Sequence, residues 1–187
     1  MLKYIIDLII TVIILFFLSL PFLVIAIIIK LTSPGPVLYW SDRVGKDNKI
    51  FKMAKFRTMR INTPPIPTHL FKDAQRYITS IGSFLRKFSL DELPQLFNII
   101  TGDMTFVGPR PALFNQDDLI RLRTCKGVHT LVPGVTGWAQ VNGRDELPIP
   151  IKVEFDAYYL RNKNLFFDAR ILFVTVFKVL KREAVSH

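Results

Sequence analysis

An uncharged run near the amino terminus constrains this chain more than any other feature of its sequence. Between Asp7 and Lys30 lie 22 residues without a charge, Leu8 to Ile29. As an α-helix the run would be about 33 Å long, close to the ~30 Å hydrocarbon thickness of a bilayer. A cleaved signal peptide has a shorter apolar region and a small-residue exit, which this run lacks. The sequence therefore predicts a retained membrane anchor over residues 1–30.

A proline in the middle of this run leaves two arrangements of the anchor open. Pro21 removes one helical hydrogen bond and kinks a helix, and the hydroxyl of Ser19 can satisfy a freed carbonyl. One arrangement is a kinked helix that crosses the bilayer. The other is a re-entrant hairpin of two short helices that returns to the side from which it entered.

Residues 31–187 are predicted to form one basic, cytoplasmic domain. The whole chain of 187 residues carries a net charge of +10, and the part beyond residue 30 keeps +9. Such a charge favours an anionic membrane surface and phosphate-bearing ligands. The lone cysteine, Cys125, suits a reducing compartment and is interpreted as a small buried or neutral residue. The positive-inside rule places the body in the cytoplasm, because basic residues follow the apolar run closely: Arg43, Lys46, Lys49, Lys52, Lys55, Arg57 and Arg60.

The predicted fold class is α+β, mainly helical with a short β-hairpin. Residues 37–40 and 50–56 are typical of two strands, joined by the polar residues 43–49. Residues 166–182 are typical of an amphipathic basic helix, which either lies in the membrane interface or packs on the core.

Three segments carry residues suited to phosphate chemistry. The segment from Ser89 to Asn98 contains Asp91 and Glu92, which either belong to a helix cap or form an acidic pair that holds Mg²⁺. Arg110 stands between two prolines, either as a phosphate-binding residue on a rigid turn or as an ordinary surface arginine. The glycine-rich residues 133–144 could cradle a nucleotide diphosphate.

The order of these motifs resembles the bacterial sugar transferase family, the monotopic phosphoglycosyl transferases. The resemblance runs from the anchor to about Asp168. The chain is similar to the minimal form of the family, which consists of the catalytic domain. It rests on seven motifs: Ser33-Pro34-Gly35-Pro36-Val37, Arg43-Val44-Gly45, Lys55-Phe56-Arg57-Thr58-Met59, the residues 89–96, Gly102-Asp103-Met104, the residues 107–111 and the residues 134–144.

The resemblance implies a monotopic protein on the cytoplasmic face of the bacterial inner membrane. Its anchor would be a re-entrant helix broken at Ser19 and Pro21, and amphipathic helices would lie at the interface. Asp91 would be the nucleophile, and Glu92 its acidic partner near Mg²⁺, for which Mn²⁺ could substitute. The enzyme would transfer a phosphosugar, with an N-acetylated amino sugar expected, from a UDP-sugar to undecaprenyl phosphate, release UMP and initiate glycoconjugate assembly.

A carboxylate attacks a diphosphate only where cations neutralise charge at phosphorus, so basic residues are expected around Asp91. The predicted phosphate contacts are Lys55, Arg57, Arg110 and Arg144, and the predicted nucleotide contacts are Gln140 and Asn142. The alternative function is a non-catalytic, membrane-tethered basic binding or scaffold protein that binds lipid headgroups. Nucleic acid is not an expected partner, because no zinc-finger, RNA-recognition or helix-turn-helix pattern occurs. The sequence does not indicate an oligomeric state.

Overall fold

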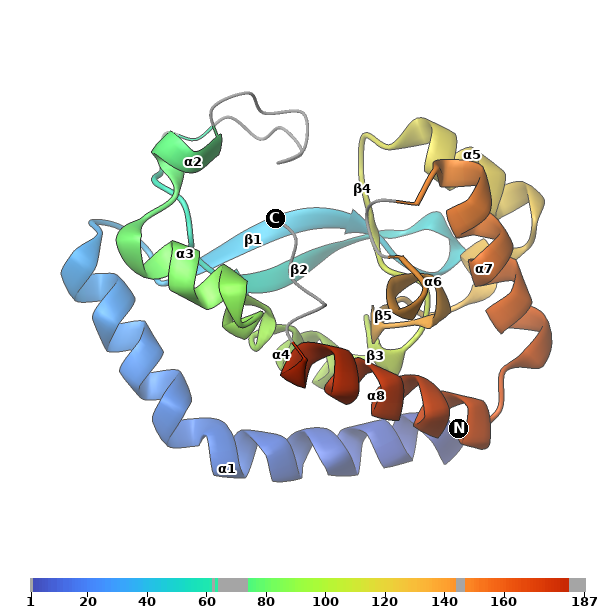
Figure 1. The fold of residues 1–187 in the computed structure, drawn as a ribbon, viewed down its shortest axis with the longest axis horizontal. Helices are drawn as coiled ribbons and strands as arrows, with labels where there is room; N and C mark the ends of the chain where they lie inside the picture. The colour runs from blue at the N-terminus through green and yellow to red at the C-terminus, as the bar shows by residue number, and fades with distance from the viewer. Residues whose placement is uncertain (1, 62, 64–73, 144–146, 182–187) are drawn as a thin grey trace.

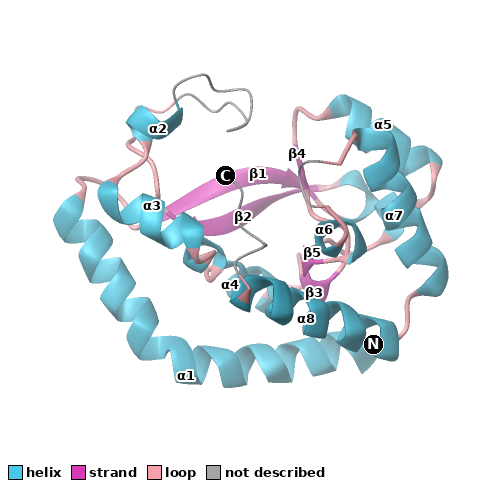
Figure 2. Cartoon of the chain, in the orientation of Figure 1, coloured by secondary structure: helices cyan, strands magenta, loops and turns pink. Residues whose placement is uncertain are grey.

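The computed structural model describes residues 2–61, 63, 74–143 and 147–181, and confirms an α+β fold dominated by helices (Figures 1 and 2). The strands are β1 (Leu38–Val44), β2 (Ile50–Phe56), β3 (Thr105–Val107), β4 (Ala112–Leu113) and β5 (Gly134–Thr136). The helices are α1 (Leu2–Thr32), α2 (Ala74–Tyr77), α3 (Ser80–Lys87), α4 (Gln95–Ile100), α5 (Asp117–Cys125), α6 (Trp138–Val141), α7 (Ile149–Asn162) and α8 (Leu165–Leu180), with short 3₁₀ turns η1 (Lys46–Asn48), η3 (Leu90–Glu92) and η4 (Val128–Thr130).

The predicted hairpin is present and its first strand is longer than predicted. β1 and β2 pair antiparallel from Leu38 with Phe56 to Val44 with Ile50. β4 pairs with the other side of β1 at Val44 and Ala112, so the sheet order is β2-β1-β4. Arg43 and Val44 were predicted as part of the connection between the two strands. They are extended because strands on both sides supply hydrogen-bond partners, which the local sequence does not reveal.

A second, two-stranded sheet leads directly into the turn that carries Arg110. β3 and β5 pair in parallel, with Thr105 opposite Gly134 and Val107 opposite Thr136. A Cβ atom on Gly108 would lie 2.5 Å from the carbonyl oxygen of Val132, so the two segments approach as closely as they do only with glycine there. The close approach fixes where the chain leaves β3.

The apolar run forms one helix, α1, which bends in Figure 1 and contains Pro21. Its last residue, Thr32, lies two residues beyond the predicted boundary of the anchor. The hydroxyl of Ser19 donates to the carbonyl of Phe16 at 2.8 Å, whereas the carbonyl that loses its partner to Pro21 is that of Phe17. Among the described residues, α1 alone is long and apolar enough to cross a membrane.

The charged start of α1 is held against the body of the protein. Lys3 pairs with Asp168 at the start of α8 and donates to the carbonyl of Val107 at 3.0 Å. One turn later, the buried carboxylate of Asp7 accepts a hydrogen bond from Thr105 of β3. These contacts tie the amino-terminal half of α1 to the β3–β5 sheet.

The end of α1 is held by Arg57, which follows β2. Its guanidinium donates to the carbonyl of Ser33 at 2.7 Å and to the carbonyl of Pro34 at 2.5 Å. These bonds satisfy carbonyl groups beyond the helix end, where a cation also interacts favourably with the helix dipole. Gly35 adopts φ +117°, and a Cβ atom there would lie 2.3 Å from the Arg57 guanidinium. The end of α1 is therefore fixed to the strand that carries Lys55.

The predicted amphipathic helix is present as α8. Of the two predicted locations, the membrane interface and the protein core, the structure shows packing on the core. Phe167 and Ile171 are buried in the core with Val107 and Tyr159, so one face of α8 packs on the body. The opposite face is apolar as well and is exposed, with Phe166 83% and Phe173 74% accessible. An exposed apolar face of this size needs a partner outside the protein chain.

Substitution of Gly82 by alanine should destabilise the fold. A Cβ atom on Gly82 would lie 2.2 Å from the backbone carbonyl oxygen of Thr58, which also accepts from the backbone N–H of Thr79 at 2.9 Å and so cannot move freely. We expect Gly82→Ala to lower the free energy of unfolding by about 1–3 kcal/mol, measured by denaturation in detergent micelles. Ser83→Ala, at the exposed neighbouring position, is the control and should change it by less than about 0.5 kcal/mol. Equal stability of the two variants would contradict the packing described here.

Candidate functional site

The acidic pair lies on a 3₁₀ turn rather than at a helix cap. Asp91 and Glu92 belong to η3, whereas α4 begins at Gln95, after Pro94. Ser89 adopts a left-handed conformation with φ 54° and makes no side-chain capping hydrogen bond. The capping alternative is therefore wrong, because Pro94 delays the helix until after the acidic pair. Asp91 is buried, and both carboxylates line a large cleft.

Two of the predicted basic residues meet at one oxygen of Glu92. Lys55 Nζ lies 2.9 Å from Glu92 Oε1, and Arg110 Nη2 lies 3.0 Å from the same oxygen. Burial by itself would raise the pKa of Glu92, but Arg110 and Lys55 outweigh it and hold the pKa well below its usual value. Glu92 is therefore ionised at neutral pH and links β2 to the turn after β3.

Asn98 on α4 explains how Lys55 reaches the acidic pair. Its side-chain amide spans the free edge of β2: Oδ1 accepts from the N–H of Ala54 at 2.9 Å, and Nδ2 donates to the carbonyl of Lys52 at 2.8 Å. Asn98 is buried, and its helix directly follows η3. The amide thus takes the place of a neighbouring strand and sets the position of Lys55 relative to Glu92.

Arg86, near the end of α3, is a site residue that sequence reasoning missed. Its Nε donates to Thr58 Oγ1 at 3.0 Å, and its guanidinium interacts with the carboxylate of Asp91. Burial lowers the pKa of Arg86, and the charge of Asp91 opposes this shift. The available signal was a basic residue five positions before Asp91, but a basic last turn is also an ordinary feature of a helix end.

The acidic pair lies in a cleft of about 1150 Å³ with a strongly basic lining. The cleft reaches from the hairpin and η3 to α8, where Thr175, Lys178 and Val179 form part of its wall. The predicted residues in the lining are Asp91, Glu92, Lys55, Arg57, Arg110 and Gln140, and further basic residues there are Arg43, Arg60, Arg86, Arg123, Lys152 and Lys178. A cavity with this charge is suited to a large, multiply anionic ligand.

The remaining predicted contacts differ in where the structure places them. Both polar atoms of the Gln140 amide lack a hydrogen-bond partner within the described chain, which leaves a donor and an acceptor without a protein partner. Asn142 is exposed outside the cleft lining and donates to the carbonyl of Trp138 at 2.7 Å. Arg57 is in the lining, but its guanidinium is engaged at the end of α1. Arg144 lies outside the described residues.

The acidic pair has the composition of a site for Mg²⁺ shared with a substrate. Within residues 2–61, 63, 74–143 and 147–181, no three His, Cys, Asp or Glu side chains form a complete metal cage. Mg²⁺ is commonly bound by one or two carboxylates together with phosphate oxygens and water. Asp91 and Glu92 fit this pattern, because they are adjacent, they face the cleft, and Glu92 is ionised.

Removal of Lys55 should raise the pKa of Glu92. In Lys55→Met the burial that favours the protonated form remains, while one of the two cations that oppose it is lost. The pKa can be measured from the carboxyl ¹³C shift of Glu92 in detergent. Lys52→Met, three residues earlier on β2 and paired with the partly exposed Asp42, is the control and should leave this pKa unchanged.

The same pKa shift predicts a pH dependence of stability. Because the folded-state pKa is lowered, ionised Glu92 stabilises the fold above its ordinary pKa of about 4.3, and this contribution disappears as the pH falls through the folded-state value. Lys55→Met should therefore make the protein less dependent on pH below about 4.3. An unchanged Glu92 pKa and an unchanged acid profile would contradict the cation assignment.

Comparison with known proteins agrees with the resemblance seen in the motifs. The family described as bacterial sugar transferase matches residues 1–182. The chain is 40% identical over 181 residues to UDP-glucose:undecaprenyl-phosphate glucose-1-phosphate transferase of Escherichia coli K12, covering 92% of this chain and 39% of that protein. It is 39% identical over 161 residues to UDP-N-acetylgalactosamine-undecaprenyl-phosphate N-acetylgalactosaminephosphotransferase of Aeromonas hydrophila, covering 83% of this chain and 38% of that protein.

A shorter relative shares most of its length with this chain. The uncharacterized sugar transferase EpsL of Bacillus subtilis is 39% identical over 159 residues, covering 85% of this chain and 77% of that protein. In the two longer relatives, by contrast, the chain spans less than two fifths of the protein. The match over residues 1–182 includes the anchor, the acidic pair and the Arg110 turn. The chain therefore belongs to the bacterial sugar transferase family.

Proposed function

We propose that this protein is a phosphoglycosyl transferase that moves a phosphosugar from a UDP-sugar to undecaprenyl phosphate and releases UMP. The observation that carries the proposal is the acidic pair, which lies among basic side chains in a cleft large enough for a nucleotide sugar. Family membership and the printed names of the relatives support the choice of substrates. Such an enzyme would act in the initiation of glycoconjugate assembly.

In the proposed mechanism, Asp91 is the nucleophile of two successive displacements. Its carboxylate attacks the sugar-bearing phosphorus, the bond to the bridging oxygen breaks, and UMP leaves. A phosphate oxygen of undecaprenyl phosphate then attacks the aspartyl phosphosugar, which forms the lipid diphosphosugar and frees Asp91. Arg86, Lys55 and Arg110 surround the pair and oppose the negative charge that would otherwise repel an attacking carboxylate.

Asp91 and Glu92 would also hold Mg²⁺, which when bound neutralises diphosphate charge and assists departure of UMP. The ionised state of Glu92 suits a cation. Gln140 would contact the nucleotide, since its amide has both a donor and an acceptor without a partner in the described chain. The relatives' names include glucose and N-acetylgalactosamine, and an N-acetylated amino sugar is the proposed donor group here.

Asp91→Asn is the direct test of the nucleophile. The variant should fold and remain in membranes, and UMP release should fall by at least about a thousandfold, because an amide does not form the covalent intermediate. UMP release is measured with Mg²⁺, undecaprenyl phosphate and each of four donors: UDP-glucose, UDP-galactose, UDP-N-acetylglucosamine and UDP-N-acetylgalactosamine. The fastest donor identifies the sugar. Asp118→Asn on the exposed face of α5 is the control and should retain full activity.

Two results would reject this assignment. Turnover of Asp91→Asn within tenfold of the wild type would exclude Asp91 as the nucleophile. A wild-type protein that releases no UMP from any of the four donors would instead be the membrane-tethered binding protein.

Removal of divalent cations should abolish the reaction. We expect UMP release to stop after chelation and to return on addition of Mg²⁺ or Mn²⁺, because the carboxylates and arginines do not by themselves bring an anion onto a diphosphate. The control is the same chelator already saturated with Ca²⁺, which tests for effects of the chelator other than removal of the metal. Full activity after exhaustive chelation would mean that the basic side chains suffice.

The anchor is proposed to re-enter on the cytoplasmic side of the inner membrane. Support comes from the ion pair of Lys3 with Asp168 and the bond of Thr105 to Asp7, which hold the first turns of α1 on the body of the protein. A helix that crossed would carry these charges away from their partners. The exposed apolar face of α8, with Phe166 and Phe173, would lie in the interface beside α1.

Cysteine labelling distinguishes the two arrangements of the anchor. Cys125 is exposed, contrary to the buried reading, and reports the side on which the body lies. In spheroplasts, an impermeant thiol reagent should label neither wild-type Cys125 nor Leu2→Cys in a Cys125→Ser background, and both should be labelled after permeabilisation. Labelling of position 2 in intact spheroplasts would support a crossing helix. Pro21→Ala with Ser19→Ala should shift the anchor toward crossing, because the straightened helix is long enough to span.

A further inference from the structure

We infer that Arg123 is a positioning residue that holds the turn of Arg110 so that the Arg110 guanidinium reaches Glu92. The inference rests on the proposed function and deepens it, because Arg110 is one of the two cations at the acidic pair. Arg123 itself does not contact Glu92. It acts on the backbone that carries Arg110.

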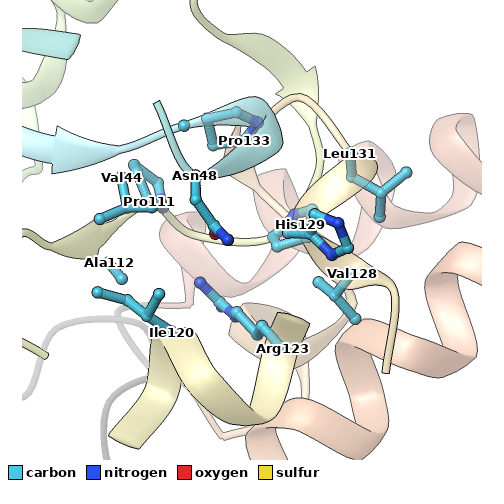
Figure 3. A pocket seen from close by; sticks show the side chains of 12 residues that line it. Val44, Asn48, Pro111, Ala112, Ile120, Arg123, Val128, His129, Leu131 and Pro133 are labelled. Carbon is cyan, nitrogen blue, oxygen red and sulfur yellow. The ribbon is translucent and has the colours of Figure 1, made fainter. Parts of the chain in front are cut away.

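The turn from Pro109 to Pro111 has few backbone donors with which to form hydrogen bonds of its own. Two of its three residues are prolines and have no backbone N–H to donate. A cavity of about 30 Å³ lies behind it, lined in part by Pro109, Pro111 and Arg123, so the turn is not fully backed by packed side chains. Figure 3 shows Arg123 extending from α5 into this space, toward the segment of Pro111 and Ala112.

Donors from three other segments hold the three carbonyl groups of the turn. The backbone N–H of Gly134 donates to the carbonyl of Pro109 at 2.9 Å. Arg123 Nη1 donates to the carbonyl of Arg110 at 2.8 Å, and Arg43 Nη1 donates to the carbonyl of Pro111 at 3.3 Å. The central bond, made by Arg123, is the shortest of the three. It acts at the residue whose side chain enters the catalytic cleft.

Arg123 is fixed in turn by a buried carboxylate on α7. Its Nε and Nη2 donate to Asp156 Oδ2 at 2.9 and 2.6 Å, which leaves Nη1 for the carbonyl of Arg110. The Arg123 side chain is 9% exposed and that of Asp156 is 1% exposed. A planar guanidinium can serve both partners at once, whereas a lysine ammonium paired with Asp156 would not keep this fork geometry.

The decisive experiment is a double-mutant cycle between Arg123 and Arg110, measured as kcat/KM for UMP release with the four UDP-sugars named above. In the wild-type background we expect Arg123→Lys to lower kcat/KM by about 10- to 100-fold, since displacement of a catalytic group by about 1 Å has effects of this size. In the Arg110→Met background the same substitution should cost less than about twofold, because Arg123 acts through Arg110. The melting temperature should fall equally in both backgrounds.

Two further variants keep the test sharp. Arg123→Met combined with Asp156→Leu removes the buried pair without leaving a charge unpaired, and should show the same dependence on Arg110 if Arg123→Lys fails to fold. Lys126→Met is the matched control, because Lys126 and Glu154 also join the end of α5 to α7 at 2.9 Å and do not touch the Arg110 turn. Its kcat/KM should equal that of the wild type.

The outcomes separate this inference from the proposed function. Equal losses on Arg123 substitution in both backgrounds would overturn the positioning role while leaving the transferase function intact. An inactive wild type would overturn the function, and arginine side-chain ¹⁵N NMR in micelles then decides the inference by itself. We expect slow rotation of the Arg110 guanidinium in the wild type and faster rotation in Arg123→Lys; equal rotation would overturn the positioning role.

Discussion

The carboxylate of Glu92 is the contact on which the arrangement of the cleft depends. It joins η3, β2 and the turn after β3, because Lys55 and Arg110 both donate to the same oxygen. The two segments that carry the cations are fixed independently: Asn98 pairs with the edge of β2, and Arg123, Arg43 and Gly134 hold the Arg110 turn. The two cations therefore arrive at a carboxylate whose charge they stabilise, and the cleft is organised before a substrate enters.

The anchor is part of this organisation rather than a separate tether. Its first turns bind β3 and α8 through Asp7 and Lys3, and its end is bound by Arg57. β3 leads into the Arg110 turn, and Arg57 follows Lys55 by two residues. Both ends of α1 thus contact segments that lead within a few residues to the two cations at Glu92. Under the proposed function, this connection would hold the site at a fixed position relative to α1 while one cleft meets a soluble and a lipid-borne phosphate.

The exposed apolar surfaces agree with this geometry. Phe16, Phe17 and Leu20 near the bend of α1, and Phe166 and Phe173 on α8, are all more than two thirds exposed. Figure 1 shows α8 and the amino-terminal part of α1 low in the view, with the β1–β2 hairpin above them. Their burial in lipid would remove from water the surface that the fold leaves uncovered.

The sequence by itself determined the features that depend on local chemistry. An uncharged run of 22 residues defined α1, alternating and β-rich residues defined the hairpin, and the motif order around Asp91 and Arg110 indicated the family. Local patterns were less reliable where a partner from elsewhere in the chain intervenes. β1 continued into residues that were predicted to connect the strands, because β4 pairs with it. The α-helix after the acidic pair begins only at Gln95, so the cap that was one of the two alternatives for Asp91 and Glu92 is not formed.

Only the tertiary structure decided how the basic residues divide their work. Lys55 and Arg110 meet Glu92 across 37 and 18 residues of chain, Arg57 turns to the end of α1, and Arg86 faces Asp91. The sequence presents all four as similar cations, because an arginine's partner is set by which backbone and carboxylate groups packing brings within about 3 Å. Arg123 is the clearest case: its partners are the carboxylate of Asp156 and one carbonyl of the Arg110 turn, and neither follows from its position in the chain.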